Sequence, residues 1–190
     1  IDEEDIAYVK DILKGSAETT ELADANYDQE VDEEDIAQIE RIINGTESSL
    51  TFIDIFGDAE TVNKPINHVA ALGYIGPQLL RLIGAEDRML PVVGPDYSNY
   101  PVFWGEMSQW HSVGNTPPDV DFEHILSLSP DAVQTNLEFL NYANDAGRKM
   151  KEEFGRNLPG IPLICLNARE PEHTSATVLI YGYIFDEEEK

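Results

Sequence analysis

Short apolar runs alternate with helix-spaced segments over most of the chain after residue 50. The strand-like runs are Val69–Gly73, Met89–Val93, Ala132–Gln134 and Leu163–Leu166, and the helix-like segments are Pro77–Ile83, Phe122–Leu128 and Ala143–Phe154. A loosely alternating run at Leu50–Asp54, a turn to Gly57 and a second run at Glu60–Val62 predict a small hairpin before them. Strands that alternate with helices in this way predict an α/β fold, with a parallel sheet flanked by helices.

The first 45 residues have a different pattern, in which isoleucines recur at helical spacing among acidic residues. The apolar face of a predicted amphipathic helix consists of Ile36, Ile39, Ile42 and Ile43. Residues 1–15 (IDEEDIAYVKDILKG) match residues 31–45 (VDEEDIAQIERIING) at eight of fifteen positions, with a constant offset of 30. A tandem repeat of one loop and one helix is the simplest interpretation, and it predicts a small all-α helix pair. By that offset Asp2 and Asp5 are the last two ligand positions of a first loop, within which the chain begins.

The segment between the two repeats places oxygen-bearing side chains at the spacing of a calcium loop. The donors at loop positions 1, 3, 5, 7, 9 and 12 are Asp24, Asn26, Asp28, Glu30, Asp32 and Asp35. Because Ca²⁺ takes about six to eight oxygen ligands, a loop that leads straight into an amphipathic helix predicts a calcium site that organises that helix. The alternative is an acidic loop that only caps the helix and needs no metal.

This pair of loops and helices over residues 1–45 resembles the dockerin family of calcium-binding modules. The resemblance implies calcium as the bound ion and a cohesin-like protein as a partner. Two departures from the family pattern are Gln29, where the sixth loop position is usually Gly, and the incomplete first loop. A polar stretch follows Gly45, so residues 46–50 are predicted to be a linker between this module and a second domain over residues 51–190.

The composition is strongly acidic, with 12 basic and 37 acidic residues and a formal net charge of −25. Such a charge opposes phosphate backbones and anionic lipid surfaces, so no direct nucleic-acid footprint is expected. No apolar run is long enough to span a membrane and no signal peptide is recognisable in this chain. The single cysteine, Cys165, lies in an apolar run and is predicted to be a buried small hydrophobic residue.

A second resemblance covers residues 50–190. Its pieces are Asp54-x-x-Gly57, Pro65-x-x-His68-Val69, Ile83–Arg88, Val113-Gly114-Asn115, Glu123–Asp131 and Gly160-Ile161-Pro162. In this order and spacing they are similar to the substrate-binding proteins of iron-siderophore and corrinoid ABC importers. The resemblance implies the N-terminal lobe of a two-lobed protein, with a connecting helix beginning near Glu187 and a second lobe beyond the chain. It further implies an iron chelate or corrinoid ligand, ABC permease subunits as partners, and a location outside the cell membrane.

Ligands of parallel α/β lobes meet the loops at the carboxyl ends of the strands. In this chain those loops are rich in aromatic and amide side chains, which suit a flat and partly polar ligand. The predicted ligand-contacting residues are Tyr74, Tyr97, Tyr100, Trp104, Trp110, His111 and Asn136. Phe103 and Trp104 could equally cover the sheet as core. His124 and His173 have no metal-ligand partner at a useful spacing, and no site is predicted for them.

No catalytic motif is present in the sequence. It contains neither a glycine-rich phosphate loop with a lysine, nor a Gly-x-Ser-x-Gly elbow, nor a Cys/His pairing. An enzyme is therefore not expected, and the resemblance of residues 50–190 to substrate-binding proteins implies a protein that captures a ligand and does not convert it. The alternative is a cell-surface scaffold or adhesion protein, in which the calcium module docks to a cohesin-like partner.

Overall fold

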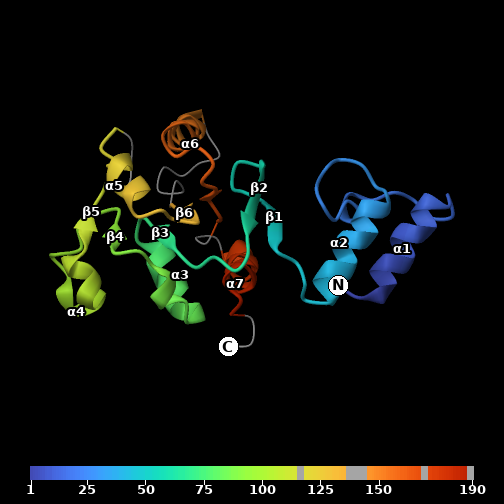
Figure 1. The fold of residues 1–190 in the computed structure, drawn as a ribbon, viewed down its shortest axis with the longest axis horizontal. Coiled ribbons are helices and arrows are strands. Elements are labelled where there is room, and N and C mark those ends of the chain that lie inside the picture. The colour runs from blue at the N-terminus through green and yellow to red at the C-terminus, as the bar shows by residue number, and fades with distance from the viewer. Residues whose placement is uncertain (115–117, 136–144, 168–170, 188–190) are drawn as a thin grey trace. The chain divides into compact units, whose positions relative to one another are not determined.

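A computed structural model describes residues 1–114, 118–135, 145–167 and 171–187 of the chain. The chain divides into two compact units, Ile1–Thr51 and Phe52–Lys190 (Figure 1). The first unit is helical and the second is α/β. No helix among the described residues is both long enough and apolar enough to cross a membrane.

The helical unit consists of two helices that pack against each other, α1 (Glu3–Leu13) and α2 (Glu33–Ile43), with a short helical turn, η1 (Glu21–Ala23), between them in sequence. Each helix begins with an aspartate pair in which both side chains accept backbone N–H groups across the first turn. Such capping boxes satisfy N–H groups that have no partner within the helix. The small core contains Val9, Ala23 and Ile39.

At the start of the α/β unit, strands β1 (Ser49–Ile53), of which only the last two residues belong to this unit, and β2 (Ala59–Asn63) pair as a two-stranded sheet and confirm the predicted hairpin. The central sheet has the order β3-β6-β7 and consists of β3 (Val69–Ala71), β6 (Ala132–Gln134) and β7 (Leu163–Ile164), all parallel. A second parallel pair consists of β4 (Val92–Val93) and β5 (His111–Ser112). A parallel bridge between Val69 and Met89 brings the start of this pair beside β3.

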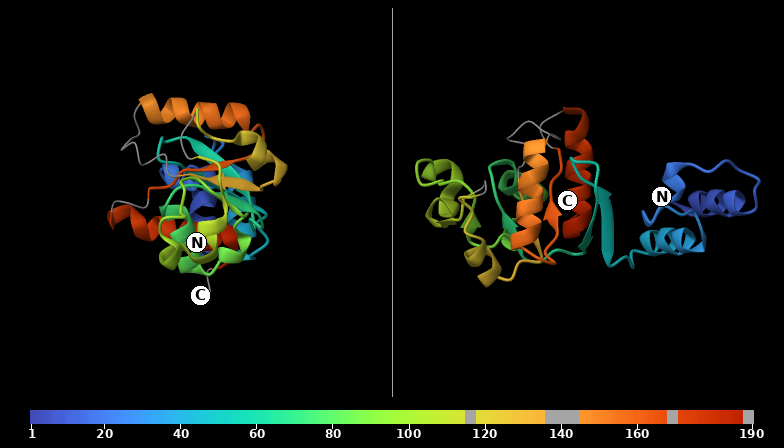
Figure 2. Two further views of the ribbon diagram at one scale, coloured as in Figure 1. Left: turned by 90° about the vertical axis from the view of Figure 1, so that its left-hand side faces the viewer. Right: turned by 90° about the horizontal axis from the view of Figure 1, so that it is seen from above.

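Helices cover both faces of the strands. They are α3 (Ile75–Ile83), α4 (Pro101–Trp104), α5 (Phe122–Ser127), α6 (Asp145–Asn157) and α7 (Pro171–Phe185), with short turns η2 (Glu86–Arg88) and η3 (Gly105–Gln109). Figures 1 and 2 show α5 and α6 on one side of the strands and α3 and α7 on the other. Successive strand residues alternate between these layers, so that Ala70 and Val133 lie in one core with Phe154 of α6.

The predicted fold class is confirmed, because the observed sheet is parallel and flanked by helices. Three predicted strands are shorter than expected: residues 69–73 contribute only Val69–Ala71, residues 89–93 only Val92–Val93, and residues 163–166 only Leu163–Ile164. The sequence had not predicted the helix α7, which ends at Phe185. The connecting helix that the resemblance implied near Glu187 stays a prediction, because residues 188–190 lie outside the described residues. Cys165 is buried, as predicted.

Candidate functional site

Three aromatic side chains form a stack beside the carboxyl end of β3. Tyr97 and Trp104 lie nearly parallel, with ring centres 3.9 Å apart and an angle of 7° between the rings. Tyr74 lies shortly after the end of β3 at Ala71, and its ring centre is 5.6 Å from Tyr97 and 6.1 Å from Trp104. We call these three residues the aromatic cluster. Tyr74 is 36% exposed while the other two are buried, so Tyr74 forms the accessible face of the cluster.

Tyr97 is fixed within the protein and does not present its hydroxyl to solvent. Only 1% of the residue is exposed, and its hydroxyl donates a hydrogen bond to the carbonyl of Gly73. Burial, assisted by the neighbouring Tyr74, raises the pKa of Tyr97 well above its ordinary value of 10.0. A neutral phenol is therefore favoured here, and a phenolate ligand for iron would require Tyr97 to leave this position.

Arg81 of α3 attaches the segment that carries the cluster. Its guanidinium donates hydrogen bonds to the carbonyls of Phe103 (3.3 Å) and Trp104 (3.0 Å) and lies 5.8 Å from the centre of the Trp104 ring. A cation at the last carbonyls of the short helix α4 is electrostatically favourable. Of the two residues whose role the sequence left open, Trp104 is core whereas Phe103 is exposed and meets Trp104 edge-on at 4.8 Å.

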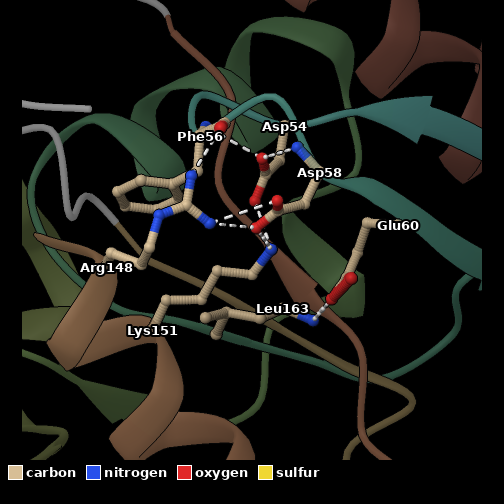
Figure 3. Close-up of polar contacts among 7 residues, drawn as sticks. All are labelled: Asp54, Phe56, Asp58, Glu60, Arg148, Lys151 and Leu163. Carbon is tan, nitrogen blue, oxygen red and sulfur yellow. Dashed lines mark hydrogen bonds and ion pairs between the residues drawn. The ribbon is translucent and has the colours of Figure 1, made fainter. Parts of the chain in front are cut away.

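A network of charged side chains connects the β1–β2 turn to α6 (Figure 3). Lys151 donates to Asp54 (2.6 Å) and Asp58 (3.0 Å), and Arg148 donates to Asp58 (3.0 Å) and to the carbonyl of Phe56 (2.9 Å). Asp54 also accepts the backbone N–H groups of Phe56 and Asp58, which closes the turn. The buried carboxylate of Asp54 thus has a countercharge and hydrogen-bond donors on more than one side.

The network shifts the pKa values of two of its members. Hydrogen bonds from Lys151 and then from Arg148 lower the pKa of Asp58 below its ordinary value of 3.8. Burial on its own would lower the pKa of Lys151, but hydrogen bonds to Asp54 and Asp58 outweigh that effect and raise it above 10.5. Both shifts favour the charged forms, so the network is a set of ion pairs at neutral pH.

The loop before α2 turns several of its oxygens inward. Asp35 is fully buried, with one carboxylate oxygen accepting the N–H groups of Ala25 (2.7 Å) and Asn26 (3.2 Å) and the other accepting that of Asp32 (2.8 Å). The carboxylate of Asp24 receives the N–H groups of Asp28 and Gln29 at the opposite side of the loop. Asp24 and Asp35, the first and last predicted donor positions, are therefore both held by backbone N–H groups of the loop.

The backbone of this loop has the turn that a calcium loop needs at its sixth position. Gln29 has φ of 75°, a left-handed value that is usual for glycine. The donor set fits Ca²⁺ chemically, since all its members offer oxygen. Among the described residues, however, no three His, Cys, Asp or Glu side chains already stand in a geometry that could hold a metal. Backbone N–H groups donate to the carboxylates of Asp24 and Asp35, and a carboxylate can accept such bonds with some lone pairs while it ligates an ion with others.

No family model matches the sequence, and no curated protein matches it. Solved structures do resemble the fold. The molybdate periplasmic binding protein MolA of Haemophilus influenzae, in its molybdate-bound form, matches with a TM-score of 0.58 at 15% identity, over 74% of this chain and 47% of its own. The fold is that of one lobe of a periplasmic binding protein.

Two further neighbours are of the same kind. An ABC transporter solute-binding protein from Sulfurospirillum deleyianum matches with a TM-score of 0.56 at 15% identity, over 73% of this chain and 43% of its own. The petrobactin-binding protein YclQ of Bacillus subtilis matches with a TM-score of 0.55 at 18% identity, over 75% and 47%. The chain spans less than half of the length of each. All three are binding proteins and none is an enzyme.

In this lobe the predicted ligand-contacting residues separate into three groups. Tyr74, Tyr97 and Trp104 come together as the aromatic cluster. Tyr100 is exposed at the start of α4, Trp110 is half-buried after η3, and the ring of His111 lies against that of His124. Asn136 lies outside the described residues. Contact with a ligand stays a prediction for all seven residues.

Two structural features of the candidate sites were not found by sequence reasoning. Arg81 is an ordinary basic residue in the last turn of a predicted helix, and no local signal indicated that its guanidinium reaches α4. The pairing of His111 with His124 was also missed, because β5 is a short exposed strand without apolar alternation and was interpreted as part of a loop.

Proposed function

We propose that the α/β unit is a lobe of the substrate-binding component of an ABC importer, which captures an iron chelate such as a siderophore or haem, or a corrinoid, and delivers it to permease subunits. The observation that carries this proposal is the fold, which is shared with proteins described as binding molybdate and petrobactin. Capture requires a binding surface and no reactive group, which agrees with the binding role of all three neighbours.

The aromatic cluster supports a flat and partly polar cargo. Tyr74 offers an exposed ring and a hydroxyl, while Tyr97 and Trp104 behind it are rigidly stacked. Aromatic side chains contribute large contact areas at small entropic cost, and a polar tip allows a hydrogen bond to the same ligand. A ring backed by two fixed rings is therefore suited to a chelate or macrocycle with an unsaturated face.

Spectroscopic titration of the full natural protein with ferric siderophores, haem, cobalamin and molybdate tests this proposal. We expect one of the first three to bind with Kd of about 1 µM or tighter, and Tyr74→Ala to weaken it about tenfold. Tyr8→Ala, which removes an exposed tyrosine from the helical unit, is the matched control and should leave Kd unchanged. Binding of molybdate alone, or of none of the four, would overturn the assigned cargo class.

We further propose that residues 1–45 are a dockerin-like module that binds Ca²⁺ through the loop from Asp24 to Asp35 and docks to a cohesin-like partner outside the cell membrane. The support is the left-handed Gln29, the buried Asp35 and the oxygen donors in register. Adding Ca²⁺ to the chelator-treated protein should raise its helicity and melting temperature. Asp35→Asn should abolish that increase, whereas Asp11→Asn in α1 should not. A melting temperature that Ca²⁺ leaves unchanged would contradict the proposal.

If this module is the functional part of the chain, the protein is a cell-surface scaffold and the α/β unit is an adhesion or spacer domain. The specific observation in favour of this second candidate is the repeat itself, because α1 and α2 begin with the same capping box and thus present two similar helix starts. Calcium-dependent binding to a cohesin domain, together with no binding of any chelate by the α/β unit, would support the scaffold over the importer component.

A further inference from the structure

Two histidines from different elements of the α/β unit have their rings in contact. His111 is the first residue of β5 and His124 lies in α5. Their ring centres are 4.4 Å apart, and the rings are inclined at 51°. The chain has four histidines, and the other two lie elsewhere in the sequence, at positions 68 and 173. The contact therefore concentrates half of the imidazoles of the protein at one place.

A carboxylate completes this group. Asp121 caps α5, with one carboxylate oxygen accepting the N–H of His124 at 3.0 Å. Its other carboxylate oxygen lies 3.9 Å from Nε2 of His111. The side chains of His111 and Asp121 are 54% and 51% exposed, so both are accessible from solvent and can rotate. We call His111, Asp121 and His124 the histidine site.

Imidazole nitrogen and carboxylate oxygen together are a ligand set for divalent transition metals such as Zn²⁺. Two imidazoles bound to one tetrahedral ion at about 2.0–2.1 Å place their ring centres roughly 5 Å apart. The observed 4.4 Å is slightly shorter, so a small rotation of the exposed His111 ring would create the space for an ion. No three such side chains within the described ranges already have metal-holding geometry, and the rotation is therefore a required step.

The geometry points to a binding site for a divalent transition metal, with Zn²⁺ as the representative ion, formed by the imidazoles of His111 and His124 and the second carboxylate oxygen of Asp121. Water supplies the remaining ligand. The metal links β5 to the first turn of α5. A hydrogen bond from the N–H of Asp121 to the carbonyl of Val113 already holds the same two segments together. This site is separate from the predicted calcium loop, whose donors are oxygens only.

The test is a Zn²⁺ titration of the full chain in saturating Ca²⁺, which occupies the acidic loop, followed by NMR of the imidazole nitrogens. We expect the signals of His111 and His124 to change together and to saturate at one equivalent. Since removal of even an outer partner of a metal ligand lowers affinity about 10–100-fold, His111→Ala and His124→Ala should each weaken binding at least about tenfold. Asp121→Asn keeps a capping side chain and should also weaken it.

His68 provides the matched control, because it also lies beside a carboxylate but has no second imidazole in contact. Its Nδ1 is 3.6 Å from Asp131, and both side chains are largely exposed. His68→Ala should leave the affinity for Zn²⁺ unchanged. Equal weakening in His68→Ala and His111→Ala would show that Zn²⁺ binds single surface histidines and would overturn the site. So would signals of His111 and His124 that stay constant up to about 1 mM Zn²⁺ in a protein with unaltered circular dichroism.

Discussion

The ammonium of Lys151 lies 2.6 Å from a carboxylate oxygen of Asp54, although 97 positions separate the two residues in the chain. The side chain of Asp54 is completely inaccessible to solvent, and that of Lys151 is 17% exposed. A buried ion pair of this kind contributes little net stability, but the loss of either partner is strongly destabilising because it leaves the other charge buried without a countercharge. The connection fixes the turn after β1 to helix α6.

We expect Lys151→Met to lower the free energy of unfolding by about 3 kcal/mol, because it leaves the buried carboxylate of Asp54 without a countercharge. Arg148→Met is the control, since its partner Asp58 is partly exposed, and it should lower that free energy by about 1 kcal/mol. Urea unfolding, followed by the fluorescence of Trp104 and Trp110, the two tryptophans of the chain, measures the free energy of unfolding of both variants. Equal losses in the two variants would contradict the importance of burial.

The same network predicts how stability depends on pH. The folded pKa of Asp58 is lowered, so its contribution is present above its ordinary 3.8 and is lost as the pH falls through the folded value. The folded pKa of Lys151 is raised, so its contribution is present below its ordinary 10.5 and is lost as the pH rises through the folded value. Urea unfolding at a series of pH values should therefore show a plateau between these limits. Lys151→Met should flatten the decline on both sides, and unchanged slopes would be evidence against the assignment.

Tyr97→Phe should lower the free energy of unfolding by about 1 kcal/mol, because it leaves the carbonyl of Gly73 without its hydroxyl donor. Burial raises the folded pKa of Tyr97, so its phenol stabilises the fold below its ordinary 10.0, and that contribution is lost as the pH rises further. Ultraviolet titration should show that Tyr97 ionises only on unfolding, so the number of late-ionising tyrosines should fall by one in Tyr97→Phe. Tyr100→Phe, at an exposed site, should leave that number unchanged.

Two helical glycines should respond in opposite directions to alanine. A Cβ at Gly76 in α3 would overlap the side-chain amide of Gln134, whereas a Cβ at Gly155 in α6 would have no atom within 4 Å. We expect Gly76→Ala to destabilise the α/β unit by about 1–3 kcal/mol through overpacking. Gly155→Ala should stabilise it by up to about 1 kcal/mol through helix propensity. Thermal unfolding measures the stability of both variants. A stabilising Gly76→Ala would show that the side chain of Gln134 moves aside freely.

Gln29→Gly should stabilise the loop before α2 by up to about 1 kcal/mol, because a left-handed φ of 75° is unfavourable for glutamine and available to glycine. Melting of the helical unit by circular dichroism should show the gain both with and without Ca²⁺. Asn44→Gly is a control at a residue with an ordinary φ of −85°, where glycine relieves no strain. A gain of the same size at both positions would indicate that strain at Gln29 is not the cause.

The strands that could be predicted are those whose own residues show an apolar, strand-like pattern. Ala132–Gln134 was predicted with its observed bounds because it begins with two apolar residues directly after the helix-stopping Pro130-Asp131. Strand β5 could not be predicted, since His111 and Ser112 are both exposed and alternate in neither polarity nor size. Two-residue strands of this kind form because a neighbouring strand supplies hydrogen bonds, which local periodicity does not encode.

The candidate sites, like the strands, could be predicted only in part. The aromatic residues near the carboxyl ends of the strands could be found from the sequence, but the hydrogen bond from Arg81 to the carbonyl of Trp104, 23 positions away, could not. Likewise, Asp54 could be recognised as a turn residue, whereas nothing in the sequence around its partner Lys151 distinguishes it from the other basic residues of the chain. Long-range pairs of charged groups arise from topology, and a single sequence contains no local pattern that identifies them.

Because Cys165 is buried, the rate at which its thiol reacts can measure how often the interior of the α/β unit opens. It is the only thiol of the chain, lies directly after β7 and is 2% exposed. A thiol reagent can reach it only while the segment around β7 separates from its neighbours. The rate at which the untreated protein acquires a label therefore reports the opening of the sheet interior without any engineered probe.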